Sequence, residues 1–390
     1  MASPFAVLPG AVIDESASTT DSATPPDSAT PPDSGGAPLH FGTFLREQRL
    51  LAEGRAIVHL GDRVALSVAG ADRLTWLDSI TSQHLARLEP GRATELLVLD
   101  PHGHVEHAAS VLDDGVTTWL IADATSAEAL ATWLKRMVFR AQVVVTREAD
   151  LTVLGSFGGG AAEALIAPHV HAPADVPLVW IDPWSHVTVG GHQYATGPHP
   201  AADWNWRQAI VTTDAAADIA AAIPRAADVE AAGLIAAEAL RIAAWRPRRA
   251  NEVDERTLPH ELDWLRSAVH LDKGCYRGQE TVAKVHNLGH PPRRLVFLHL
   301  DGSDAVLPEP GASVSLAGTE VGRVTSAALH HELGPIALAV VKRTLPIDAT
   351  LTVTVGDETV IAAQEVIVPP GAGAEASVPR LPRLSARTRA

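Results

Sequence analysis

Apolar and polar positions alternate with two different periods along the amino-terminal half of the chain. Residues 63–70, RVALSVAG, form an apolar run of strand length, whereas residues 71–88 carry leucine and isoleucine at the spacing of one helix face. Strand-length runs then recur, and a second helical pattern interrupts them. The segments are strands at 93–100, 105–112 and 116–123, a helix at 126–138 and a strand at 141–146. This mixed order predicts an α+β layered fold rather than a doubly wound parallel sheet.

The pattern changes twice in the carboxy-terminal half. Residues 216–245 are rich in alanine, which favours helix, and Pro224 predicts a break between two helices. Beyond Arg294, short β-rich runs are separated by turn residues at regular intervals. They predict a small antiparallel barrel or sandwich, with a boundary near residues 289–294.

Both ends of the chain are poor in residues that could form a core. Residues 21–34 repeat DSATPP, and residues 369–390 are rich in proline, glycine, alanine and arginine. We expect disordered tails at 1–38 and 369–390, a two-section α+β region at 39–290 and a barrel at 291–368. The 390 residues are enough for two or three domains.

Charge and cysteine content narrow the functional classes. The formal net charge of −15 argues against a protein that coats nucleic acid with its whole surface, so direct nucleic-acid binding is not expected. A single cysteine excludes an internal disulfide and a CxxC metal site. We find neither a signal-peptide pattern nor an apolar run long enough to cross a membrane. The expectation is a cytoplasmic monomer.

The single cysteine lies in LDKGCYRGQE, residues 271–280. Lys273 and Arg277 stand two residues to either side of Cys275, and in an extended segment they share its face. Nearby cations favour the thiolate, which is the nucleophilic and metal-binding form. A lone cysteine can equally be a small buried hydrophobic residue, and the pattern leaves both possibilities open.

The segment 241–294 is basic in an acidic chain. It holds eleven Arg and Lys against seven Asp and Glu, and RPRR at 246–249 is one of its densest points. Such a segment can attract an anionic small molecule or a phosphate-bearing partner. RPRR by itself is better explained as a solvated loop.

KGCYRGQE resembles the K-G-C-Y-x-G-Q-E signature of the YgfZ family of folate-binding proteins, which are related to the glycine cleavage T-protein, an aminomethyltransferase. LRIAAWRPR at 240–248, TLPHELDW at 257–264 and LDPHGHVEH at 99–107 resemble further stretches of that family. The resemblance covers roughly residues 41–368. It implies a glycine cleavage T-protein-like disc of three parts that ends in an antiparallel β-barrel and surrounds a central folate site.

The resemblance also implies a function and a set of site residues. The family supports iron–sulfur enzymes, including ones that modify tRNA, so the expected partners are tetrahydrofolate or a derivative and iron–sulfur client proteins. A role as an accessory factor for cluster assembly or maintenance is expected rather than a turnover enzyme. The expected functional residues are Cys275, Lys273 and Asp100, and the expected folate-binding residues are Arg241, Glu261, Tyr276, Arg277 and Gln279. Among these, Glu261 is the candidate for hydrogen bonding to the pterin ring. Arg241 is the candidate for pairing with the anionic glutamate tail of the folate.

Departures from the T-protein pattern weigh against the alternative function, a tetrahydrofolate-dependent aminomethyl transferase. The turn after Asp100 continues with Glu106 and His107 where T-proteins carry an Asp-Asp pair. Trp245 replaces a glycine that is usual in the family, which predicts a differently shaped loop. Asp100 itself could simply cap its Asp-Pro-x-Gly turn.

Overall fold

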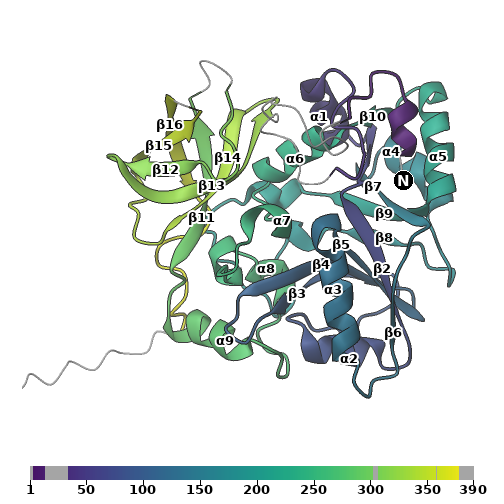
Figure 1. Cartoon of the computed structure of the whole chain (residues 1–390), viewed down its shortest axis with the longest axis horizontal. Helices are drawn as coiled ribbons and strands as arrows, with labels where there is room; N and C mark the ends of the chain where they lie inside the picture. The colour runs from purple at the N-terminus through teal and green to yellow at the C-terminus, as the bar shows by residue number, and fades with distance from the viewer. Residues whose placement is uncertain (1–2, 14–33, 302–305, 357, 377–390) are drawn as a thin grey trace, which may run out of the picture.

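The computed structural model describes residues 3–13, 34–301, 306–356 and 358–376. Within these residues, two five-stranded sheets and a six-stranded barrel make up the β-structure, and nine α-helices cover or connect them. Figure 1 shows the barrel beside the two sheets, with α6 to α8 between the barrel and the rest. The predicted α+β fold with a carboxy-terminal antiparallel barrel is confirmed.

The first sheet has the strand order β10-β1-β7-β9-β8, and its one parallel pair joins β1 to β10. One face packs on a cluster formed by an amino-terminal 3-10 helix together with α4 and α5. The elements concerned are the 3-10 helix Pro4–Val7, β1 Ala56–His59, β7 Leu151–Phe157, α4 Ala161–Ile166, β8 Val179–Ile181, β9 Trp206–Thr212, α5 Thr213–Ala222 and β10 Glu230–Ala232.

The second sheet has the order β3-β4-β5-β2-β6, with every pair antiparallel. Helices α2 and α3 bury their apolar residues against one face of it. Its elements are β2 Arg63–Ala69, α2 Arg73–Ile80, β3 Ala93–Leu99, β4 Val105–Asp113, β5 Thr117–Asp123, α3 Ala124–Met137 and β6 Val144–Arg147. The helix predicted over 71–88 stops at Ile80, because Thr81 takes an extended conformation with φ −127° and ψ 168°.

The barrel is closed in the order β11-β14-β13-β12-β15-β16. Its inward-facing aliphatic side chains form a core of their own. The strands are β11 Arg293–Leu300, β12 Ser313–Leu316, β13 Thr319–His330, β14 Gly334–Lys342, β15 Thr350–Val355 and β16 Glu358–Val366.

Helices between the sheets and the barrel complete the chain. The predicted break in 216–245 is present, but β10 lies between the two helices and was not predicted. These helices are α1 Phe44–Ala52, α6 Leu234–Ala243, α7 Arg249–Glu252, α8 Leu265–Ala268 and α9 Gln279–Leu288. None of the helices in the described ranges is long and apolar enough to span a membrane.

The two expected disordered tails are folded where the structure describes them. The side chain of Phe5 is buried and stacks on the ring of His59 at a centroid distance of 5.8 Å. At the other end, residues 369–376 run back along α9, where the amides of Ala374 and Glu375 donate to the carbonyls of Val285 and His286. Residues 14–33, which include most of the DSATPP repeat, and residues 377–390 lie outside the described residues. The tail prediction is therefore wrong for 3–13, 34–38 and 369–376, because single apolar residues in these segments find places in the core.

Candidate functional site

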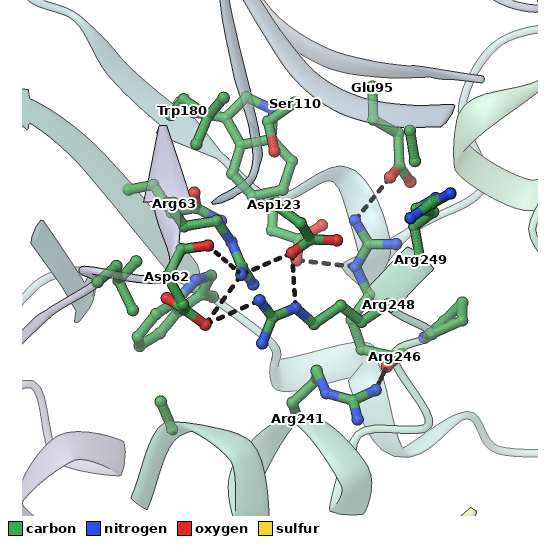
Figure 2. Close-up of a pocket in the computed structure, with 18 of the residues that line it drawn as sticks. Asp62, Arg63, Glu95, Ser110, Asp123, Trp180, Arg241, Arg246, Arg248 and Arg249 are labelled. Atoms are coloured by element: carbon green, nitrogen blue, oxygen red, sulfur yellow. Dashed lines mark hydrogen bonds and ion pairs between the residues drawn. The ribbon is translucent and has the colours of Figure 1, made fainter. Parts of the chain in front are cut away.

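A cavity lies where the two sheets meet α6 and the loop that follows it. Four tryptophans and several aliphatic side chains form its apolar lining. Arginines and carboxylates supply most of its polar groups (Figure 2). The tryptophans are Trp180, Trp204, Trp206 and Trp264. Aromatic walls with a few convergent polar groups are typical of small-molecule sites.

Arg246 occupies the end of this cavity near β3. Its Nε donates to Asp182 Oδ2 at 3.0 Å, and its Nη2 donates to Glu95 Oε2 at 2.7 Å. The indole N–H of Trp264 donates to the same Glu95 oxygen at 3.1 Å. The guanidinium also lies over the ring of Trp184, 5.1 Å from its centroid. These contacts fix the orientation of both Glu95 and Arg246.

Four buried polar atoms of the cavity lining have no hydrogen-bond partner within the described part of the chain. They are two carboxylate oxygens, an amide oxygen and a guanidinium nitrogen: Asp62 Oδ1, Glu95 Oε1, Gln208 Oε1 and Arg246 Nη1. Buried polar groups are almost always hydrogen-bonded in folded proteins. The cavity thus offers acceptors and a donor to a bound molecule or to ordered water.

Arg248 crosses a second part of the cavity. It donates from Nε to Asp123 Oδ1 at 2.7 Å and lies 2.8 Å from Asp62 Oδ2 through Nη2. Arg63 also donates to both carboxylates, so two arginines and two aspartates form a closed square (Figure 2). Burial alone raises the pKa of Asp123, but the Arg248 and Arg63 charges together with hydrogen bonds bring it down to about 2.

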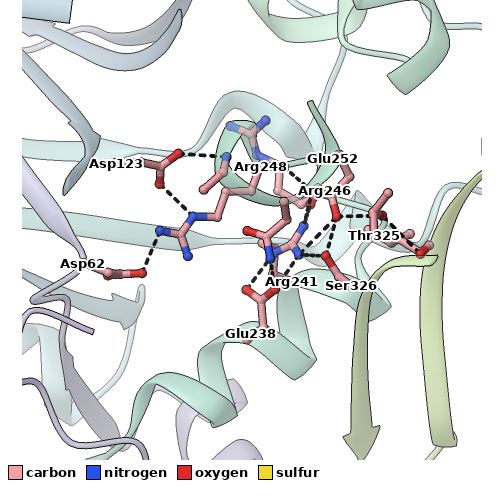
Figure 3. A network of polar contacts seen from close by, with 12 residues as sticks. Asp62, Asp123, Glu238, Arg241, Arg246, Arg248, Glu252, Thr325 and Ser326 are labelled. Atoms are coloured by element: carbon pink, nitrogen blue, oxygen red, sulfur yellow. Dashed lines mark hydrogen bonds and ion pairs between the residues drawn. The ribbon is translucent and has the colours of Figure 1, made fainter. Parts of the chain in front are cut away.

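Arg241 continues these contacts toward the barrel. It donates to Glu238 and Glu252 and to Ser326 Oγ on β13, the last at 2.7 Å (Figure 3). Glu252 in turn accepts from the hydroxyl of Thr325 at 3.1 Å and from that of Ser326. We call Arg241, Glu252, Thr325 and Ser326 the barrel clasp. It joins α6, α7 and β13 through buried groups.

The structure brings one of the predicted folate-binding residues, Arg241, to the cavity. Glu261 does not line it: its Oε2 accepts from Arg293 Nε at 3.0 Å, and burial raises the pKa of its carboxyl to about 7. Glu95 is one of the carboxylates that do line it, and its Oε1 has no hydrogen-bond partner among the described residues. Sequence reasoning also assigned RPRR to solvent, whereas the structure buries Arg246 and Arg248.

The other predicted residues cluster in the loop before α9, which we call the signature loop, residues 270–278. Cys275 is exposed, as a reactive thiol requires, but it does not line the cavity. Lys273 Nζ donates to the carbonyls of Asp78, Thr81 and Gln83 at the end of α2. Arg277 pairs with Glu106 on β4. Both cations that were expected beside the sulfur therefore have other partners.

Three remaining predicted residues have structural roles. Tyr276 is buried in the central core, and Gln279 Nε2 donates to the Lys273 carbonyl at 3.3 Å. Asp100 Oδ1 accepts from the amides of His102 and His104, each at 2.8 Å. Asp100 thus caps its turn, the interpretation that the sequence favoured.

The signature loop and the Asp100 turn touch through their backbones. Gly278 has φ +82°, and a Cβ placed on it would lie 2.6 Å from the Asp100 carbonyl oxygen. Gly103 has φ +84°, and a Cβ there would lie 2.9 Å from Thr281 Cβ. Only glycine fits at either position.

The tryptophan that replaces the expected glycine keeps the conformation of a glycine. Trp245 has φ +57°, in the left-handed region, and its indole is buried. Trp245 thus takes a backbone conformation that glycine favours. The strain of a non-glycine residue there, about 1–2 kcal/mol, is offset by packing of the indole against His199 and Phe297.

Known structures include one with the same overall fold. Superposition on the glycine cleavage system aminomethyltransferase T from Bartonella henselae gives a TM-score of 0.68 at 16% identity, covering 88% of this chain and 94% of that one. This chain has the glycine cleavage T-protein fold. Residues 293–370 match the glycine cleavage T-protein C-terminal barrel domain.

Sequence relatives agree with the T-protein fold. An aminomethyltransferase of Rippkaea orientalis is 27% identical over 322 residues, covering 74% of this chain and 78% of its own. One from Moorella thermoacetica is 38% identical over 118 residues, covering 30% of this chain and 31% of its own. These are the proteins that this T-protein-like chain resembles.

Proposed function

We propose that this protein binds tetrahydrofolate or a close derivative in the tryptophan-walled cavity. The observation that carries the proposal is the pair of unpartnered atoms Glu95 Oε1 and Arg246 Nη1 between aromatic walls. The aminopyrimidinone edge of a pterin carries adjacent N–H donors and a carbonyl acceptor. Glu95 complements the donors, and Arg246 complements the carbonyl.

The residues present fit such a molecule in three respects. Trp264 and Trp180 supply flat apolar surface for the ring, and direct contact with Arg246 fixes the position of the Glu95 carboxylate. Arg249 lies at the border between the cavity and an outer groove lined by Glu106 and His107, where it could meet an anionic tail. When bound, tetrahydrofolate would supply one-carbon or reducing chemistry, while the chain binds and orients it.

We further propose that the protein acts as an accessory factor for iron–sulfur enzymes, as in the YgfZ family, through the exposed Cys275. The alternative is a folate-dependent aminomethyl transferase, the activity by which its relatives are named. Each carboxylate of the cavity lining pairs with an arginine, so among the described residues the lining presents no carboxylate without a cationic partner to act as a general base, and this favours the accessory role.

Binding of 5-formyltetrahydrofolate, followed by quenching of tryptophan fluorescence, tests the ligand. Glu95→Gln should weaken binding about tenfold, because it replaces an acceptor by a donor opposite the pterin N–H groups. Glu163→Gln is the matched control, since its carboxylate pairs with Arg207 away from both the cavity and the outer groove. Absence of saturable binding, or equal affinity in Glu95→Gln and wild type, would contradict the proposal.

The cellular role is tested separately. Deleting the gene should lower the activities of iron–sulfur enzymes, and wild type should restore them while Cys275→Ala should not. Rescue by Cys275→Ala equal to that by wild type would exclude the thiol from the function. Loss of glycine cleavage without loss of iron–sulfur enzyme activity would favour the transferase.

A further inference from the structure

A turn at the end of α3 holds an aromatic residue in an unfavourable position. Helix α3 ends at Met137, and the Ala141 amide donates to the Val138 carbonyl at 2.8 Å, which closes a tight turn. Phe139, inside that turn, has φ +41°, a conformation that favours glycine, asparagine or aspartate.

The Phe139 side chain gains no packing that would offset this strain. It is 87% exposed, among the highest values for large apolar residues in the described chain. Trp245 has the same kind of strained backbone, but its indole is buried. A strained residue that the fold does not use for packing points to a role outside the fold.

Phe139 lies beside an open sheet edge. Strand β6 pairs only with β2, and within the residues that the structure describes no strand covers its other side (Figure 1). Val144 on β6 is 65% exposed and Met137 is 38% exposed. Natural proteins usually protect such edges, because unpaired backbone groups beside apolar side chains recruit another strand.

This corner of the molecule is basic. Residues 135–150 contain four cations, Lys135, Arg136, Arg140 and Arg147, against the carboxylates of Glu148 and Asp150, in a chain of net charge −15. All four cations are exposed, and the Arg140 guanidinium lies 5.3 Å from the centroid of the Phe139 ring. We call Met137, Phe139, Arg140, Val144 and Arg147 the β6 corner.

We infer that the β6 corner is a docking site for an extended acidic segment of a partner protein. The segment would add a strand beside β6, place an apolar side chain against Phe139 and Val144, and set carboxylates against Arg140 and Arg147. A second copy of this chain fits less well, because pairing two β6 edges would bring like charges together. Nucleic acid would meet only a few cations on an otherwise acidic molecule.

Phe139→Gly separates binding from folding. Glycine relieves the strained φ and removes the ring, so the melting temperature should stay the same or rise while binding is lost. The probe is a short fluorescein-labelled peptide of alternating valine and glutamate, measured by anisotropy with the full chain. We expect saturable binding that Phe139→Gly weakens about tenfold or more and that Arg147→Glu also weakens.

A second variant and a second peptide test whether binding is specific to the β6 corner and to acidic side chains. Val189→Ala alters another residue of similar exposure, 86%, and should leave binding unchanged. A peptide with lysine in place of glutamate should not bind, and hydrogen exchange at residues 144–147 should slow only with the acidic peptide.

Five outcomes would overturn the inference. Three concern the peptide and the variant: failure of the acidic peptide to bind, unchanged binding in Phe139→Gly, and a lower melting temperature in that variant. The other two are Phe139-dependent binding of a single-stranded RNA oligonucleotide and Phe139-dependent dimerisation seen by light scattering, either of them in place of peptide binding.

Discussion

Asp263 is a buried carboxyl whose pKa makes the stability of the fold depend on pH. It is fully buried with φ +55°, its Oδ1 accepts from the Tyr194 amide at 2.6 Å, and its Oδ2 has no partner in the described ranges. Burial raises the pKa of this carboxyl to about 7, although the hydrogen bond from the Tyr194 amide and the charge of Arg266 lower it. The folded state therefore holds a proton that the unfolded state releases near pH 4.

We predict that Asp263→Asn stabilises the protein at pH 8 by about 3–4 kcal/mol more than at pH 4, because the folded and unfolded pKa values differ by about three units. Between roughly pH 4 and 7 the native state binds more protons than the unfolded state, so this group's contribution to stability falls as pH rises. Asparagine keeps the acceptor for Tyr194, tolerates positive φ and has no charge to bury.

Urea unfolding at both pH values measures the difference between variant and wild type. The exposed Asp348→Asn is the control and should show no pH-dependent difference. Equal stabilisation of Asp263→Asn at both pH values would contradict the assigned titration.

At the scale of elements, the signature loop depends on its attachment to α2. The Lys273 side chain is fully buried and donates to one carbonyl in the last turn of α2 and to two just beyond it, where a helix end leaves carbonyl groups unpaired. Burial lowers the pKa of its ammonium to about 8, so it remains charged at neutral pH. The lysine of KGCYRGQE thus holds the loop in place.

We predict that Lys273→Met destabilises the protein by about 2–3 kcal/mol, because it leaves buried carbonyls without a donor. Hydrogen exchange should quicken at residues 270–278 and at the end of α2. Lys284→Met, at an exposed position on α9, is the control. Unchanged exchange in the loop would show that Lys273 does not hold it.

Helices and strands whose apolar residues repeat with a regular spacing were predictable from sequence. Elements whose bounds depend on contacts with residues far along the chain were not. Strands β2 to β5 and the barrel follow their apolar patterns. In contrast, α2 ends early and β10 is three residues long, and both depend on partners far along the chain. Arg246 and Arg248 looked like solvated charges, since their partners Glu95 and Asp123 lie more than a hundred residues away. The residues next to an arginine in sequence do not indicate whether it forms an ion pair with a carboxylate so far away.

At the scale of the whole molecule, the barrel clasp connects the barrel to the cavity. Glu252 has a fully buried carboxylate and contacts Arg241, Thr325 and Ser326 (Figure 3). Removing one partner of a buried ion pair leaves an uncompensated charge. The clasp therefore couples the position of the barrel to that of α6.

We predict that Glu252→Gln lowers the free energy of unfolding by about 3 kcal/mol. Glu320→Gln on the barrel surface, whose partner Arg323 is 63% exposed, should cost little and is the control. Thermal unfolding of the two variants measures the difference. Equal small effects would mean that the clasp contributes no more than a surface pair.

The contact between Gly103 and Gly278 has a consequence for sequence divergence. The two glycines lie 175 positions apart, yet a side chain on Gly278 would meet the Asp100 carbonyl, and one on Gly103 would meet Thr281 in the first turn of α9. A side chain at either glycine is acceptable only after the facing segment has moved. The turn that follows β3 and the start of α9 should therefore diverge together among descendants of this chain, and an insertion in one should accompany a change in the other.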